Sequence, residues 1–201
     1  MNTKYKIQSI LIPLAVLLSI GLAISACGPG QLFGPTLTPT PLPTPTLTPT
    51  PTPIPLSQID LSKIALQSGD LTSDFQMTEN STNTQEQGVI NYYSVSFGWS
   101  STGIGNVIRI FKNETLASDF FKNDTKAGSS NDQIEIPVLG DEAFASKFEL
   151  LGIKTVMIAW RYKETYIFLR YASQESTMQL VVDESIRLAQ QIDARLKKSL
   201  P

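Results

Sequence analysis

Three arginines and a tyrosine have the residue types and spacing to recognise an anion. A tight turn at Lys163-Glu164 would pair position 161 with position 166, so Arg161, Tyr166 and Arg170 share one face of a hairpin. Arg109 lies in an earlier strand and can join them. Because guanidinium groups bind carboxylates bidentately and stack on aromatic rings, the pattern predicts an anion-recognising or partner-binding face. The alternative is a solvated face whose arginines pair with nearby Asp or Glu.

A pair of adjacent carboxylates follows a glycine at Gly140-Asp141-Glu142. Such a pair could bind Ca²⁺ or act as general acid and base. Calcium requires six to eight oxygen ligands, and no Asp-x-Asp-x-Asp loop with a distal Glu surrounds this pair. We therefore expect a glycine-dependent turn in which the aspartate accepts hydrogen bonds from local backbone amides.

The composition excludes several kinds of catalytic and binding site. The chain of 201 residues has no histidine and one cysteine, so it cannot form a Ser-His-Asp or Cys-His pair, a His-ligated metal site or an internal disulfide. Sixteen basic residues stand against 18 acidic ones, a balance that argues against a nucleic-acid surface. We identify no catalytic constellation, metal site or cofactor site from the sequence.

The N-terminus has the pattern of an export signal. Lys4 and Lys6 precede a mostly apolar run from Ile7 to Ile24, and Ile24-Ser25-Ala26-Cys27 follows. This segment resembles the signal peptide and lipobox of bacterial prolipoproteins. The resemblance implies that residues 1–26 are removed and that Cys27 carries acyl chains such as palmitate, which anchor the protein on the extracytoplasmic face of the cell membrane. The alternatives are an uncleaved transmembrane anchor and an ordinary signal peptide followed by an unmodified cysteine.

Residues 27–55 are expected to form a spacer between this lipid anchor and the folded domain. Positions 28–55 carry no charged side chain, and nine of the thirteen prolines lie between Pro35 and Pro55, mostly alternating with threonine. Such a segment favours an extended polyproline II conformation of about 3.1 Å per residue. A proline-rich docking ligand is the alternative. The signal, the cysteine and the Thr-Pro spacer together resemble cell-surface lipoproteins of bacteria.

Residues 56–201 are predicted to form a single α+β domain. We expect a short helix at 58–66, a helix capped by Asn113, and a long C-terminal helix that begins between Thr177 and Asp183. The hydrophobic periodicity predicts five strands, at 93–99, 104–111, 148–151, 155–162 and 165–171. This order indicates an antiparallel sheet of about five strands covered on one face by helices. The architecture is weakly similar to that of PsbP-type domains.

The sequence predicts a non-catalytic, lipid-anchored binding or accessory domain outside the membrane. Its partners would be the membrane, through the lipid on Cys27, and an envelope protein, a polymer or a small anion; nucleic acid is not expected. The alternative function is a carboxylate-dependent hydrolase or small-molecule carrier that uses Asp141 or Glu142.

Overall fold

The computed structural model describes residues 54–83 and 85–200. The predicted signal peptide, Cys27 and all of the spacer except Ile54 and Pro55 lie outside the described residues. Within the described residues, no helix is long and apolar enough to cross a membrane.

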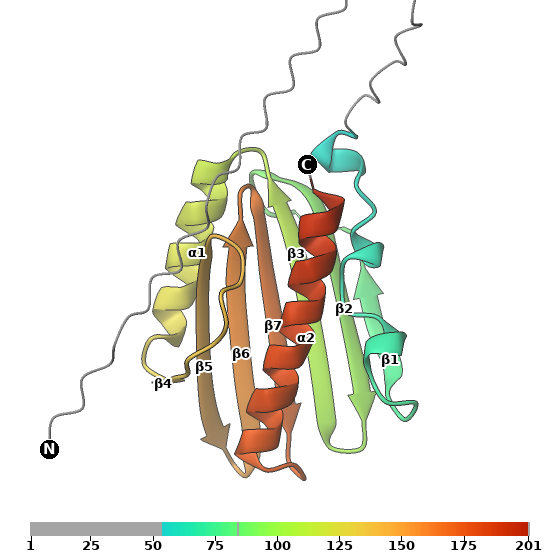
Figure 1. Cartoon of the computed structure of the whole chain (residues 1–201), viewed down its shortest axis with the longest axis vertical. Helices are drawn as coiled ribbons and strands as arrows, with labels where there is room; N and C mark the ends of the chain where they lie inside the picture. Colours follow the sequence, from blue (N-terminus) through green and yellow to red (C-terminus); the bar gives the residue numbers. More distant parts are fainter. Residues whose placement is uncertain (1–53, 84, 201) are drawn as a thin grey trace, which may run out of the picture. The chain divides into compact units, whose positions relative to one another are not determined.

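The described residues form an α+β fold built on one antiparallel sheet of seven strands (Figure 1). The strands are β1 (Gln76–Ser81), β2 (Val89–Trp99), β3 (Thr102–Phe111), β4 (Asp132–Gln133), β5 (Glu142–Leu150), β6 (Ile153–Tyr162) and β7 (Thr165–Ser173). Their order in the sheet is β1-β2-β3-β7-β6-β5-β4. The chain therefore builds one half of the sheet, then the other, and joins them where β3 pairs with β7.

The predicted hairpin register is confirmed. Arg161 pairs with Tyr166 and Met157 with Arg170, and the turn between β6 and β7 holds Lys163 at a φ of 50°. The opposite face of the two strands is apolar and fully buried, as its alternation predicts. It consists of Val156, Ile158, Trp160, Ile167 and Leu169.

The sheet has seven strands instead of the predicted five or so. The two additional strands lie at its edges. β1 and β4 have the polar sequences QMTENS and DQ, and most of their residues are exposed. Neither has the apolar alternation by which the other strands were found. Short polar strands at a sheet edge also discourage further strand pairing, which explains why these segments lack a hydrophobic signal.

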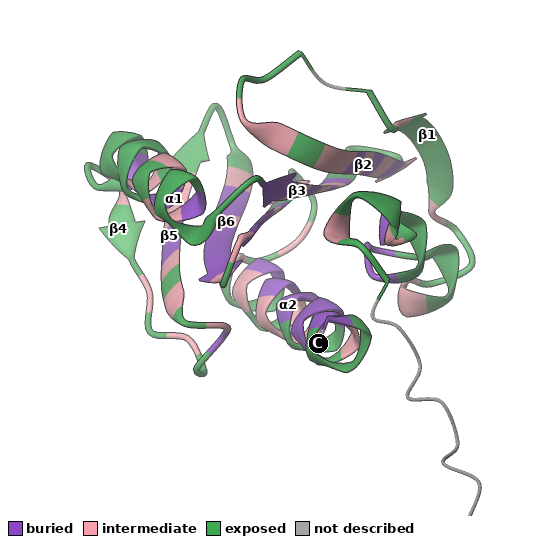
Figure 2. Cartoon of the chain, turned by 90° about the horizontal axis from the view of Figure 1, so that it is seen from above, coloured by how far each residue is buried: buried purple, intermediate pink, exposed green. Residues whose placement is uncertain are grey.

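Two helices cover opposite faces of the sheet (Figure 2), so the prediction of helices on one face only is wrong. α2 (Met178–Ser199) is capped by Thr177 and packs on the side of the main core, against β6 and β7. α1 (Glu114–Gly128) is capped by Asn113, as predicted, and buries Ala117 and Phe121 against the other face. A second, smaller apolar cluster therefore lies between α1 and the sheet. Its buried members are Phe111, Ala117, Phe121, Ala159 and Tyr166.

The predicted helix at 58–66 is wrong, because this segment forms separate turns of 3-10 helix. These are η1 (Leu56–Gln58), η2 (Leu61–Lys63) and η3 (Ser68–Asp70). The side chain of Asp60 accepts hydrogen bonds from the amide and hydroxyl of Ser62, so it caps η2 rather than continuing a helix from η1. Short polar side chains compete in this way with the helical hydrogen bonds of the backbone.

A half-buried ion pair fastens this N-terminal segment to α2. Both guanidinium Nη atoms of Arg195 donate to the carboxylate of Asp70 at 2.8 Å, and the same side chain also donates to the carbonyls of Ile64 and Ala65. Burial acts to raise the pKa of Asp70, but the hydrogen bonds from Arg195 and Gln67 outweigh it and hold the pKa below its ordinary value. The charged form of Asp70 therefore stabilises the folded state.

We expect Asp70→Asn to lower the free energy of unfolding by about 2 kcal/mol at pH 7, because it leaves Arg195 without its counter-charge. The pKa of Asp70 is lowered in the folded state, so the ionised carboxylate contributes its stability above the unfolded value near 3.8. That contribution is lost as the pH falls through the folded pKa. Urea unfolding at several pH values should show the difference between wild type and variant shrinking in acid. The exposed Asp74→Asn serves as control, with an expected change within about 0.5 kcal/mol.

Candidate functional site

The structure brings three of the four predicted face residues into one row across the sheet. Tyr92, Arg109, Tyr166, Arg161 and Glu142 are successive partners in β2, β3, β7, β6 and β5. They lie on the face that carries α1. Arg170 shares this face but lies four residues along β7 from Tyr166, beyond the part that α1 covers.

Arg161 is buried beneath the start of α1 and contacts three carboxylates. Its Nη1 donates to Oε1 of Glu114 and to the carbonyl of Lys163, each at 2.9 Å, and lies 3.6 Å from Oδ2 of Asp141. Its Nη2 donates to Oε1 of Glu142 at 3.0 Å. Burial disfavours the charge, but the hydrogen bonds to Glu142 and Glu114 outweigh it and raise the pKa of Arg161. Arg161 therefore links α1 and the β6–β7 turn to the start of β5.

Arg109 is engaged in a similar way on the other side of the row. Its Nε and Nη2 donate to the two carboxylate oxygens of Glu86 at 2.6 and 2.8 Å. Its guanidinium carbon also lies 5.1–5.7 Å from the ring centres of Tyr92, Phe120 and Tyr166. The arginine thus fills the cation–π and carboxylate-binding roles that the sequence predicts, with partners from its own chain.

The hydroxyl of Tyr166 also has an internal partner. It donates to Oδ2 of Asp124 in α1 at 2.5 Å, and the ring packs edge-on against Phe120 at 4.8 Å. Burial, together with the hydrogen bond to Asp124, raises the pKa of Tyr166. The tyrosine is therefore a neutral donor that holds α1 on the sheet.

Arg170 is the exception within the predicted face. Its side chain is exposed and makes no hydrogen bond or ion pair to any residue that the structure describes. It borders a hollow of about 390 Å³ on the sheet surface that α1 leaves uncovered. We call this surface the open face; its residues are Thr78, Ser96, Gly98, Gly103, Gly105, Arg170 and Ala172. Because three of them are glycines, the backbone of β2 and β3 is accessible beside a free guanidinium.

An apolar hollow of about 210 Å³ adjoins the open face under the second half of α1. Phe144, Met157, Ala159 and Phe168 line it from the sheet, and Met157 is the direct cross-strand partner of Arg170. The two hollows together present an apolar recess and a cation on one surface. The sequence alone predicts that this part of the face is apolar, because Met157, Ala159 and Phe168 alternate with the core residues of β6 and β7.

The Gly140-Asp141-Glu142 segment is a glycine-dependent turn that continues into β5. Gly140 has a φ of 51°, and a Cβ atom there would lie 2.1 Å from the carbonyl oxygen of Arg161. Oδ2 of Asp141 accepts from the amide of Lys163 at 2.7 Å, while Glu142 accepts from Arg161. Both carboxylates thus belong to the Arg161 cluster, and neither lines the open face, the apolar hollow beside it or the hollows next to α2. Among the described residues, no group of three or more Asp, Glu, Cys or His could hold a metal ion.

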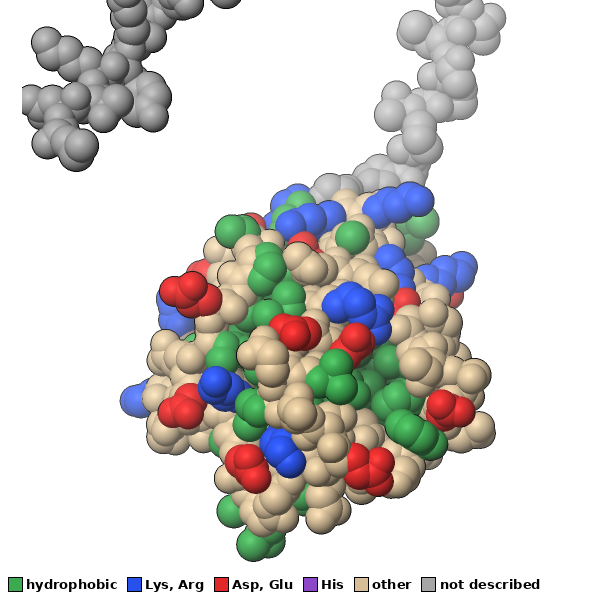
Figure 3. All heavy atoms as spheres, turned by 60° about the horizontal axis from the view of Figure 1, so that its bottom comes forward, with side chains coloured by type: hydrophobic (Ala, Val, Ile, Leu, Met, Phe, Trp, Pro, Cys, Tyr) green, Lys and Arg blue, Asp and Glu red, His purple; other side chains and the backbone are tan. Residues whose placement is uncertain are grey.

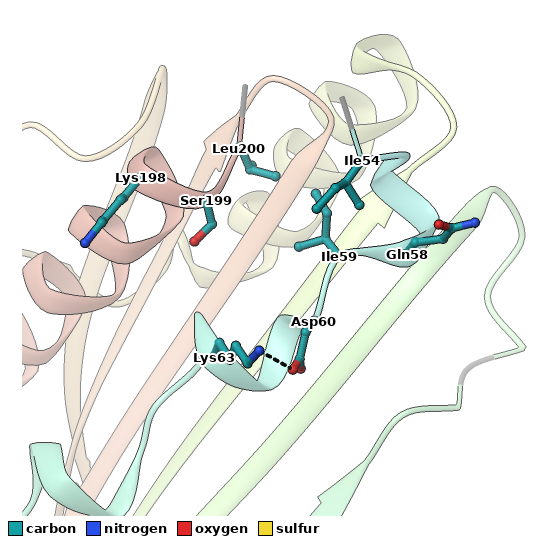
Figure 4. A pocket seen from close by; sticks show the side chains of 8 residues that line it. All are labelled: Ile54, Gln58, Ile59, Asp60, Lys63, Lys198, Ser199 and Leu200. Carbon is teal, nitrogen blue, oxygen red and sulfur yellow. Dashed lines mark ion pairs between the residues drawn. The ribbon is translucent and has the colours of Figure 1, made fainter. Parts of the chain in front are cut away.

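A further hollow, of about 470 Å³, lies between the first 3-10 turns and the end of α2 (Figure 4). Asp60 and Lys63 form an exposed ion pair of 3.5 Å there, Lys198 comes from α2, and Ile59 and Leu200 supply apolar surface. Exposed pairs of this kind contribute little binding or folding energy.

Three acidic partners were not identified from the sequence: Glu86, which pairs with Arg109, Glu114, which pairs with Arg161, and Asp124, which accepts from Tyr166. Glu86 lies in the loop before β2, Asp124 in α1 and Glu114 in the first turn of α1. The local pattern around each is that of an ordinary solvated loop or helix residue. Their role depends on α1 packing over this face, which the periodicity of α1 does not determine.

We expect Arg161→Ala to lower the free energy of unfolding by about 3 kcal/mol, because it leaves the carboxylates of Glu114, Asp141 and Glu142 without their shared cation. Arg170→Ala is the matched control on the same face and should change stability by less than about 0.5 kcal/mol. Urea unfolding followed by circular dichroism measures both. Equal effects for the two variants would contradict the division into a buried structural arginine and a free one.

Comparisons with known proteins show a likeness in fold. No family model and no curated protein matches the sequence. Among solved structures, the chain is similar to the extracellular domain of PknH from Mycobacterium tuberculosis, with a TM-score of 0.56 and 8% identity over 73% of this chain and 98% of that one. A GTP binding regulator from Thermotoga maritima gives a TM-score of 0.35 and 11% identity over 62% of this chain and 84% of that one. This TM-score is too low to indicate a shared fold. The fold of the described domain is therefore shared with the PknH domain.

Proposed function

We propose that this chain is a non-catalytic, extracytoplasmic binding domain, held at the membrane by lipid on Cys27 and raised from it by the Thr-Pro spacer. The open face around Arg170 is its binding surface. The ligand on this surface carries negative charge, as a small anion or as an acidic group of an envelope protein or polymer.

The extracytoplasmic location rests on two supports. The sequence from Lys4 to Cys27 has the order of a lipoprotein signal and lipobox. The domain that follows shares its fold with the extracellular domain of PknH, so this architecture is used outside a membrane in that protein. Stable anchoring would need more than one acyl chain, since a single chain holds a protein only weakly.

We favour binding over catalysis because of which charged side chains already have partners within the chain. Arg109 and Arg161 bind carboxylates of their own chain, and Tyr166 donates to Asp124, so these side chains hold α1 in place. Arg170 alone of the four predicted residues lacks such a partner within the described part of the chain. A free guanidinium beside exposed backbone and an apolar recess provides recognition without a group held for proton transfer.

The hydrolase alternative has weaker support in the geometry. A general acid or base needs a carboxylate that faces a substrate and can exchange a proton with it. Asp141 and Glu142 instead accept hydrogen bonds from Lys163 and Arg161. We therefore favour the binding function.

Replacing Cys27 by alanine tests the anchor. Cells expressing the wild-type chain are grown with radioactive palmitate, and the label on the purified protein is compared with that on Cys27→Ala. We expect loss of the label and release of the variant from the membrane fraction under conditions that retain the wild type. Labelling that persists in Cys27→Ala would show that the cysteine is not the attachment site.

Reversing the charge of Arg170 tests the open face. The full chain, Arg170→Glu and the control Lys122→Glu, an exposed position on α1, are each used to capture components of a solubilised envelope, which are quantified by mass spectrometry. We expect the specific component to fall at least fivefold with Arg170→Glu and to be retained by Lys122→Glu. Equal capture by all three proteins would remove the open face from the proposal.

A further inference from the structure

The main core is open at the end of the sheet where α2 begins. A hollow of about 460 Å³ lies there between the first turns of α2, the segment 70–75 and the ends of β2 and β7. We call it the aromatic pocket; its lining residues are Asp70, Leu71, Thr72, Phe75, Trp99, Ile104, Tyr171, Ser176, Leu180, Glu184 and Arg187. It lies on the α2 face of the sheet, whereas the open face lies on the α1 face.

Aromatic rings form one side of this pocket and are incompletely covered by the protein. Trp99 is 47% exposed. The centre of its ring lies 6.0 Å from that of Phe75, and the two ring planes are inclined by 56°. Leu180 in the first turn of α2 is 49% exposed beside them. Figure 3 brings this end of the molecule forward and shows hydrophobic side chains at its surface among acidic and basic ones. Aromatic surface of this kind, open to water in a cavity, is typical of a recognition site.

A hydroxyl without a protein partner accompanies the rings. Tyr171 is only 8% exposed, yet its hydroxyl makes no hydrogen bond to any described residue although the side chain lines the pocket. Burial, and to a smaller extent the charge of Glu184, raises the pKa of Tyr171, so at neutral pH the group is a hydroxyl that can both donate and accept. This hydroxyl is open to solvent, so a ligand in the pocket can replace its water with a direct hydrogen bond.

The charged groups of the pocket are paired but retain free hydrogen-bonding positions. Oε2 of Glu184 accepts from Nε and Nη2 of Arg187 at 2.9 and 2.7 Å, and Oε1 accepts no hydrogen bond from a described residue. Asp70 is paired with Arg195. Asp70 with Arg195 and Glu184 with Arg187 thus form two ion pairs, whose charges cancel at this site. Thr72 and Ser176 add hydroxyl groups at its edge.

We propose that the aromatic pocket binds a neutral saccharide. A pyranose has a C–H face that stacks on an aromatic ring, whose face is electron-rich, and an edge of hydroxyls that bond to carboxylate, guanidinium and hydroxyl groups. The pocket offers both kinds of group, because the rings of Trp99 and Phe75 and the polar side chains of Tyr171, Glu184 and Arg187 all line it. A phosphate or carboxylate ligand would meet two carboxylates whose cations are already engaged, and a purely aliphatic ligand would leave Tyr171 and Glu184 unsatisfied. The volume lies in the range of roughly 300–1,000 Å³ found for ligand pockets.

This site is separate from the open face and adds a second binding activity to the proposed function. None of the residues that define the open face lines the aromatic pocket; the hollow at the open face and the pocket share only Ile104, a core residue of β3. Loss of one activity therefore leaves the other measurable, and the two proposals can fail independently.

Tryptophan fluorescence gives a direct test because the chain has only two tryptophans. Trp160 is fully buried in the core, so quenching by acrylamide reports on Trp99. The full chain, kept in a detergent that contains no sugar, is titrated with maltose, cellobiose, mannobiose and diacetylchitobiose. We expect at least one of these neutral disaccharides to reduce the quenching constant of Trp99 in a saturable manner. If none of the four does so at concentrations up to tens of millimolar, the proposal is overturned.

Variants assign the binding to the pocket, with calorimetric titration as the readout. Trp99→Ala and Glu184→Gln should each weaken the affinity for the bound disaccharide at least fivefold, and circular dichroism checks that both remain folded. Lys122→Ala, an exposed position on α1 on the opposite side of the sheet, is the matched control and should bind the sugar as the wild type does. Unchanged affinity in both pocket variants, or tighter binding of glucuronate than of the neutral sugars, would contradict the assignment.

Discussion

A seven-stranded sheet has two faces to shield from water, and the described part of this chain supplies one long helix and one shorter helix to do so. Burying apolar area is the main favourable term in folding. The parts of the sheet that neither helix covers must therefore consist of residues that tolerate water or that form a binding surface. On the α1 face the uncovered part is built of Gly, Ser and Arg170. On the α2 face it is built of Phe75, Trp99 and Tyr171. The two candidate sites arise where helical cover ends.

The same limit explains the use of charge beneath α1. This helix buries few apolar side chains, and the row under its start contains Arg109, Arg161 and Tyr166 rather than leucine or valine. Each is paired with an acid that comes from a loop, from α1 or from β5. Removing one member of such a cluster leaves an uncompensated charge, so the cluster fixes the position of α1. Residues that could recognise an external anion are thereby used for the fold, and Arg170 is left for binding.

Sequence periodicity was a good guide to the centre of the sheet and a poor one to its edges. The alternation in β6 and β7, with the turn at Lys163, determines the register that places Arg161 opposite Tyr166, because a shift by one residue would expose Trp160 and Ile167. β1 and β4 are short and polar, so no apolar pattern marks them. The side on which α1 packs, and with it the partners Glu86 and Asp124, depends on contacts between segments far apart in the chain. The candidate face was therefore predicted, and so, as the alternative, was the pairing of its arginines with nearby acids; which arginines pair, and with which acids, was not.

Arg109 and Arg161 are held within the fold, whereas Arg170 is free of any partner among the described residues. Hydrogen exchange at the arginine Nε–H groups, followed by nuclear magnetic resonance, measures this directly for each side chain. We expect slow exchange at Arg109, whose Nε donates to Glu86, and at Arg161, whose Nε is buried. Exchange at Arg170 should be as fast as in a solvated arginine. Protection of Arg170 in the free protein, or fast exchange at Arg161, would contradict this division.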